Sequence, residues 1–200
     1  NCSGLFSDKV FQNSLKIKSP IKIIPFRGEY LKLSNRYKDL VNHLIYPTPN
    51  INFPFLGVHF TRMITGTREV GPNAVFAFKR EGYRKSDFSV IDTIDSLSYV
   101  GLRKFISKNL FFTSTEFLSS LSRKSFVKKA KNLIPDVEDY MFEEIGTSGV
   151  RAQAIDQSGN LVMDFKIEKN RNQIHILNAP SPGATASFAI ASYIFENYVK

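Results

Sequence analysis

The chain has 200 residues, of which 42% are hydrophobic and 22% are charged, and its formal net charge is +9. This composition suits a folded protein of one domain, or one and a half, and argues against intrinsic disorder. The single cysteine, Cys2, excludes an internal disulfide and a multi-cysteine metal site, and it fits a reducing, cytoplasmic compartment. No apolar run approaches the roughly 20 residues that span a bilayer, and no signal peptide is visible.

Residues 1–14 are interpreted as the end of one element followed by a helical turn, and residues 21–80 as an antiparallel sheet. Hydrophobic and polar residues alternate there with the period of a strand, and turn residues separate the runs. The predicted strands cover residues 21–26, 29–33, 42–46, 55–63 and 73–78.

The middle of the chain has the spacing of helices, predicted at about 89–108 and 114–133. Thr113 and Glu116 form a capping box at the start of the second helix. Strands follow at 149–155, 161–167 and 174–178, and an apolar helix at about 184–199. This order indicates an α+β fold: an antiparallel or mixed sheet with a helical insertion at about 87–134 and a C-terminal helix.

Two polar side chains stand out within apolar strands. His59 can take a proton near neutral pH, and on a strand it shares a face with Thr61 rather than Arg62. Arg151 carries a planar fork of donors that matches a carboxylate. A structural, half-buried histidine and an internal salt bridge are the alternatives for His59 and Arg151.

Two segments suit close approach of a flat or anionic ligand. Cys2 and Gly4 lie in a run of small residues, which lets the backbone come near a ligand. The second segment is a rigid loop that leads into the C-terminal helix, and the start of a helix attracts negative charge. The residues of this loop are Ala179, Pro180, Ser181, Pro182, Gly183, Ala184 and Thr185. A tightly packed turn is the structural alternative for each segment.

Seven short motifs, in their order and spacing, resemble the L-2-hydroxyglutarate oxidase/dehydrogenase family of D-amino-acid-oxidase-like flavoproteins. The motifs occupy residues 1–5, 25–30, 57–61, 71–74, 78–83, 149–153 and 178–182. The resemblance implies that residues 1–14 end an FAD-binding domain whose amino-terminal half is missing. It further implies that residues 15–148 form the substrate-binding domain and that residues 149–200 return to the FAD site.

The reaction implied by the resemblance is the FAD-dependent oxidation of L-2-hydroxyglutarate, or a similar 2-hydroxyacid, to the 2-oxoacid. His59 would be the base and Arg151 would bind the substrate carboxylate, while Arg27 and Tyr30 are candidates for the second carboxylate. The cofactor would contact Cys2, Gly4, Gly149 and the loop 179–185. The remaining alternatives are glycerol 3-phosphate or an amino acid as substrate, or a non-catalytic anion- or nucleic-acid-binding domain, although no nucleic-acid-binding motif is recognisable.

Positive charge is concentrated in the helical insertion. Residues 101–131 contain eight basic residues and one acidic residue, Glu116, and the pair Phe111-Phe112 lies among them. Phenylalanines flanked by lysines suit the boundary of an anionic membrane. The pattern therefore predicts a peripheral contact at the inner face of a membrane, as a dehydrogenase that passes electrons to a membrane quinone would need, or a contact with an acidic partner. An ordinary solvated basic face is the alternative.

Overall fold

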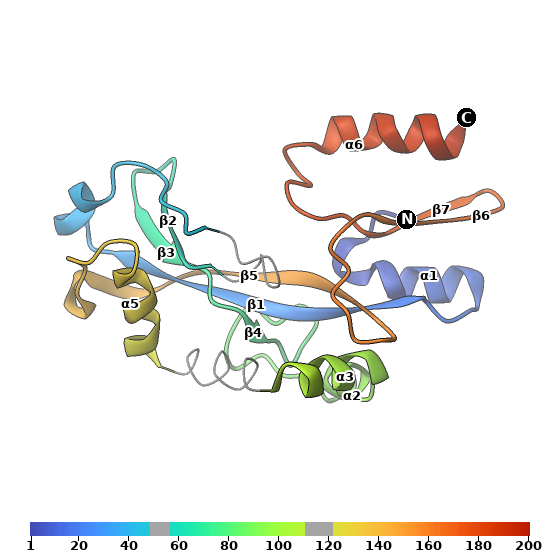
Figure 1. Cartoon of the computed structure of the whole chain (residues 1–200), viewed down its shortest axis with the longest axis horizontal. Coiled ribbons are helices and arrows are strands. Elements are labelled where there is room, and N and C mark those ends of the chain that lie inside the picture. The colour runs from blue at the N-terminus through green and yellow to red at the C-terminus, as the bar shows by residue number, and fades with distance from the viewer. Residues whose placement is uncertain (49–56, 111–121) are drawn as a thin grey trace. The chain divides into compact units, whose positions relative to one another are not determined.

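The computed structural model describes residues 1–48, 57–110 and 122–200. The chain folds into two units, whose elements are drawn in Figure 1. Unit 1 comprises residues 1–24, 91–108 and 152–200, and unit 2 comprises residues 25–90 and 109–151. The domain boundaries implied by the resemblance stay predictions.

Unit 2 is built on a five-stranded sheet to which the long strands β1 and β5 contribute most of their length. The strands β2, β3, β1 and β4 are hydrogen-bonded in that order, and β5 pairs with β1. The pairs of β3 with β1, β4 with β1 and β2 with β3 are antiparallel. The bounds are β1 (Ile21–Leu33), β2 (His59–Arg62), β3 (Arg68–Gly71), β4 (Val75–Phe76) and β5 (Phe142–Asp156).

One face of this sheet carries the core of unit 2. Phe60, Val70 and Leu31 lie side by side on β2, β3 and β1, and all three are buried. Helix α5 (Arg123–Lys131) packs its apolar side on the same cluster. Because Phe60 is completely buried, truncation to alanine would cost about 3–5 kcal/mol of stability. The opposite face of these strands carries the polar side chains described below.

Unit 1 has a smaller core and a cluster of ion pairs. Its buried apolar side chains include Phe11 and Leu177. Asp95 pairs with Lys9 at 2.7 Å and with Lys22 at 2.5 Å. No helix in the described ranges is long and apolar enough to cross a membrane. The elements are α1 (Ser7–Leu15), α2 (Val90–Leu97), α3 (Val100–Lys108), β6 (Lys166–Asn170), β7 (Gln173–Asn178) and α6 (Ser187–Ile194), with the ends of β1 and β5.

The prediction of helices together with antiparallel strands is confirmed, but several strand boundaries were wrong. Residues 21–33 form one strand, because Gly28 keeps an extended backbone instead of turning. Residues 42–46 form no strand, since only Ile45 makes a bridge, with Phe60. The strand expected at 161–167 begins only at Lys166, because the side chain of Asn178 bonds the carbonyls of Val162 and Asp164.

The helical predictions were also too long. The single helix expected at 89–108 is two helices, and the Ser98 hydroxyl donates to the Asp95 carbonyl where α2 ends. The C-terminal helix starts at Ser187, not at residue 184, and continues as a π-helical turn over Phe195–Val199. The capping box Thr113/Glu116 and the pair Phe111-Phe112 lie outside the described residues, so the predicted start of the second helix is not tested. Helix α5 begins after Ser122, whose hydroxyl accepts from the Ser125 amide.

Candidate active site

A cavity of about 200 Å³ opens in unit 2 on the face of the sheet that points away from its core. Side chains alternate along a strand, so Gly28 and Tyr30 face away from buried Leu31. Arg151, from β5, completes the wall on the same cavity. The full lining is Phe26, Arg27, Gly28, Tyr30, Pro72, Asn73, Ala74, Gly149, Val150 and Arg151.

Aromatic rings surround His59 beside this cavity. His59 pairs with Gly71 of β3, and a Cβ at Gly71 would lie 2.6 Å from the Tyr30 ring. The missing side chain therefore leaves room for Tyr30, whose ring centroid is 6.3 Å from that of His59. Tyr46 lies closer, at 4.7 Å, with its ring tilted by 31° against the imidazole. The imidazole thus contacts two tyrosines, one of which lines the cavity.

The electrostatics of this group favour a neutral histidine beside a cation. Burial lowers the pKa of His59 below its usual 6.5, and the charge of Arg151 lowers it further, against a hydrogen bond with the Gly57 backbone that raises it. Arg151 is an exposed residue of β5 whose partial burial lowers its pKa, but a guanidinium stays charged at neutral pH. Burial raises the pKa of Tyr30, so its phenol remains a hydrogen-bond donor.

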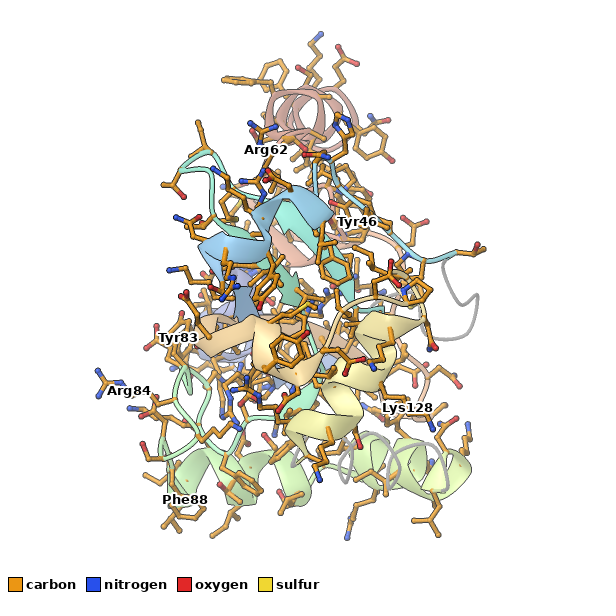
Figure 2. All side chains as sticks on the ribbon, turned by 90° about the vertical axis from the view of Figure 1, so that its left-hand side faces the viewer. Tyr46, Arg62, Tyr83, Arg84, Phe88 and Lys128 are labelled. Atoms are coloured by element: carbon orange, nitrogen blue, oxygen red, sulfur yellow. The ribbon has the colours of Figure 1, made fainter. Side chains whose placement is uncertain are left out.

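Arg27, proposed from the sequence, and Arg62, on the strand of His59, each donate to other groups of unit 2. The Arg27 side chain is buried and points to the opposite face from Tyr30, where its Nε donates to Glu29 at 3.0 Å and its Nη1 donates to the Arg84 carbonyl at 3.1 Å. The Arg84 side chain itself extends outward (Figure 2). Arg62 is exposed and donates to the Asn42 carbonyl at 3.4 Å (Figure 2). Arg151 lines the cavity, whereas Arg62 does not and the Arg27 guanidinium points to the other face of the sheet.

A second cavity, of about 150 Å³, lies in unit 1. It brings together three of the residues expected at the cofactor, Cys2, Gly4 and Ala179, with Ala152 as a further small neighbour. Gly4 has a φ of 49° and no atom within 4 Å of the position where a Cβ would be, so the space beside its backbone is open. Residues 180–185 do not line this cavity, and Gly149 lines the cavity of unit 2 instead.

Comparison with known proteins decides the family. A family model described as "DAO: FAD dependent oxidoreductase" matches residues 1–196. The chain belongs to this family. Among its relatives, the L-2-hydroxyglutarate dehydrogenase of Indibacter alkaliphilus is 50% identical over 98% of the chain, and those of Escherichia coli K12 and Homo sapiens are 42% and 44% identical over 97% and 98%. The chain spans about half the length of these relatives, between 43% and 49%.

The unit 1 cavity of this DAO-family chain fits part of the FAD on which the family depends. Small side chains and the open space at Gly4 allow a flat ring system to approach the backbone. The cavity is smaller than a whole dinucleotide, and the 200 residues contain no Gly-x-Gly-x-x-Gly loop for the pyrophosphate. These residues would therefore hold one end of the cofactor.

Sequence reasoning missed two features of the unit 2 site. No sequence pattern pointed to Tyr46, because its contact with His59 depends on a bridge between Ile45 and Phe60 that forms only in the folded chain. Asn73 belonged to a recognised motif but received no role. Its position after Pro72, which lacks an amide hydrogen, was the available signal that a strand is interrupted there.

Proposed function

We propose that these 200 residues supply the substrate pocket and part of the flavin site of a longer flavoprotein that oxidises L-2-hydroxyglutarate to 2-oxoglutarate. The observation that carries the proposal is that Tyr30 and Arg151 line one cavity and that the His59 ring lies 6.3 Å from the Tyr30 ring. The charge of Arg151 acts on the pKa values of both His59 and Tyr30. The printed names of the relatives supply the substrate.

Arg151 binds the carboxylate next to the reacting carbon. Its guanidinium is partly desolvated, and two parallel N–H donors fit the two oxygens of a carboxylate. The alkyl chain of the substrate lies along the Gly28, Pro72 and Ala74 part of the lining, where no charged side chain competes. Tyr30 donates to the second carboxylate, and Arg27 contributes positive charge from beneath the sheet.

His59 accepts the proton of the substrate hydroxyl. A lowered pKa keeps its imidazole unprotonated at neutral pH, so it is ready to act as a base. FAD, when bound, would supply the acceptor for the hydride that the same carbon gives up as its hydroxyl proton moves to the imidazole. Tyr30 and Tyr46 keep the ring oriented through these contacts.

Cys2, Gly4 and Ala179 contact the cofactor at the unit 1 cavity, with Gly149 and residues 180–185 adding contacts when the rest of the protein is present. The helical insertion contributes a peripheral membrane contact. Its charge is divided between the units, with Arg103, Lys104 and Lys108 on α3 and the remaining five basic residues on α5. On α5, Arg123 pairs with Asp139 and Lys131 with Glu138, which leaves α3 as the stronger candidate.

A substrate panel tests the proposed activity. The complete protein, purified with its flavin, is expected to have its highest kcat/KM with L-2-hydroxyglutarate, compared with its D-enantiomer, glycerol 3-phosphate and L-glutamate. Arg151→Gln is the matched variant, because it removes the cation and keeps a polar side chain of similar length. A preference for glycerol 3-phosphate or L-glutamate would contradict the proposed substrate, and turnover that is unchanged by Arg151→Gln would contradict the site.

A further inference from the structure

The sheet of unit 2 is interrupted where it borders the cavity. From residue 27 to residue 31, β1 advances four positions, while its partners advance five, from Val75 back to Val70. The extra residue lies in the segment 71–74, as in a β-bulge. Pro72 in this segment has no amide hydrogen to give to β1. Ordinary backbone pairing therefore fails at the floor of the pocket.

The side chain of Asn73 takes the place of the missing backbone. Its Oδ1 accepts from the Glu29 amide at 2.8 Å, and its Nδ2 donates to Glu29 Oε2 at 3.1 Å. Its own amide donates to the Glu29 carbonyl at 3.2 Å. Three bonds thus join one buried residue of the interrupted segment to one buried residue of β1. Because both residues are buried, water does not replace a bond that is lost.

This connection sets the wall of the pocket. Pro72 packs so closely on β1 that a Cβ at Gly28 would lie 2.7 Å from its own Cβ. Pro72, Asn73 and Ala74 all line the cavity, together with Gly28. Glu29 also accepts from Arg27, at 3.0 Å, and lies 3.5 Å from Lys85 Nζ. The carboxylate therefore fixes the segment 72–74 and holds the Arg27 guanidinium on the far face of the sheet.

We propose that Asn73 is a positioning residue for the substrate pocket, and that its bonds to Glu29 hold Pro72 and Ala74 at the spacing a dicarboxylate needs. The inference rests on the proposed function. Asn73 acts through the pocket wall rather than by reacting itself. A role confined to folding would change stability without changing the affinity for a dicarboxylate.

A charge swap tests this arrangement in the complete protein. Asn73→Asp loses the Nδ2 donor and faces the Glu29 carboxylate. Glu29→Gln leaves one of its two hydrogen-bond donors, Arg27 or Asn73, without an acceptor and loses the ion pair with Lys85. In the double variant, the side-chain carbonyl introduced at position 29 accepts from Arg27, and the new amide there donates to the carboxylate introduced at position 73. The bonds among Arg27, residue 29 and residue 73 are thereby restored and the net charge is unchanged, while the contact of Lys85 with residue 29 is lost in both Glu29→Gln proteins. Asn42→Asp is the control, since it makes the same chemical change at an exposed side chain of the same unit.

The measurement is calorimetric binding of glutarate, which has two carboxylates and no hydroxyl to react. We expect each single variant to weaken binding roughly tenfold or more, the scale of one charged hydrogen bond, and the double variant to return within about threefold of the parent. Glutarate binding that is unchanged in folded single variants, or a double variant that neither folds nor recovers, would overturn the inference. Should one single variant not fold, the other and the double variant still make the comparison. Failure of the parent protein itself to bind glutarate would instead overturn the proposed dicarboxylate site, and this inference with it.

Discussion

Replacing Arg151 separates the two effects that its guanidinium has on the site. Arg151→Lys keeps the positive charge but loses the planar fork, whereas Arg151→Gln loses both. A charge-assisted hydrogen bond contributes about 1.5–3 kcal/mol, so losing the fork should raise KM for L-2-hydroxyglutarate roughly 10- to 150-fold. The glutamine variant should lose at least as much, because no cation remains to meet the carboxylate.

The pH profile gives an independent measurement of the same contact. His59 reacts in its unprotonated form, so kcat/KM rises with pH through its pKa, which lies below 6.5. Arg151 lowers that pKa by disfavouring a second positive charge nearby. In Arg151→Gln the pKa of His59 rises, and the acid limb moves to higher pH, while in Arg151→Lys it stays near the parent value. Identical acid limbs in all three proteins, or an unchanged KM in both variants, would refute the assignment.

Other variants and conditions test the rest of the account. His59→Ala should slow anaerobic flavin reduction by roughly two to four orders of magnitude, and a slowing of less than tenfold would make His59 structural. Burial raises the pKa of Asp95, but Lys22 and Lys9 outweigh it and the pKa is lowered, so its ion pairs contribute stability that is lost only as pH falls below about 3.8. Asp95→Asn should therefore cost about 1–2 kcal/mol equally at pH 7 and pH 5, and a cost that vanishes at pH 5 in thermal unfolding would contradict this. The 200-residue chain alone should not retain FAD, because it has no pyrophosphate loop, and stoichiometric flavin absorbance in the purified chain would disprove that. Co-sedimentation of the complete protein with anionic vesicles should weaken in high salt and, by roughly fivefold or more, in Arg103→Glu, and salt-independent binding would argue against the basic surface.

Local patterns in the sequence predicted which helices, strands and turns exist better than they predicted the residues at which these begin and end. The Thr65-Gly66-Thr67 turn joins β2 and β3, with Gly66 at a φ of 86°, and the Ser158-Gly159-Asn160 turn has Gly159 at 82°. Both turns need the left-handed backbone that glycine adopts easily, so the glycine in each short sequence indicates the turn. The boundaries at residues 161–167 failed because a distant side chain, Asn178, satisfies the local carbonyls.

The candidate site was predictable in its residue types but not in its geometry. His59 and Arg151 were recognisable because each is a polar side chain within an apolar strand, and strand alternation correctly separated His59 from Arg62. The pairing of Arg27 with Glu29 was missed because the predicted strands 21–26 and 29–33 were separated at residues 27 and 28, whereas the continuous strand β1 puts both side chains on one face. The role of Asn73 depends on an interruption in sheet pairing, which a single sequence does not specify.

A crystal structure of the complete protein with 2-oxoglutarate would test the central claim most directly. We predict that one carboxylate lies within hydrogen-bond distance of the Arg151 guanidinium and that the 2-oxo oxygen faces the His59 imidazole. The rest of the ligand should lie against Pro72 and Ala74 in the cavity of unit 2. A ligand bound elsewhere, or bound in this cavity with neither carboxylate on Arg151, would contradict the account.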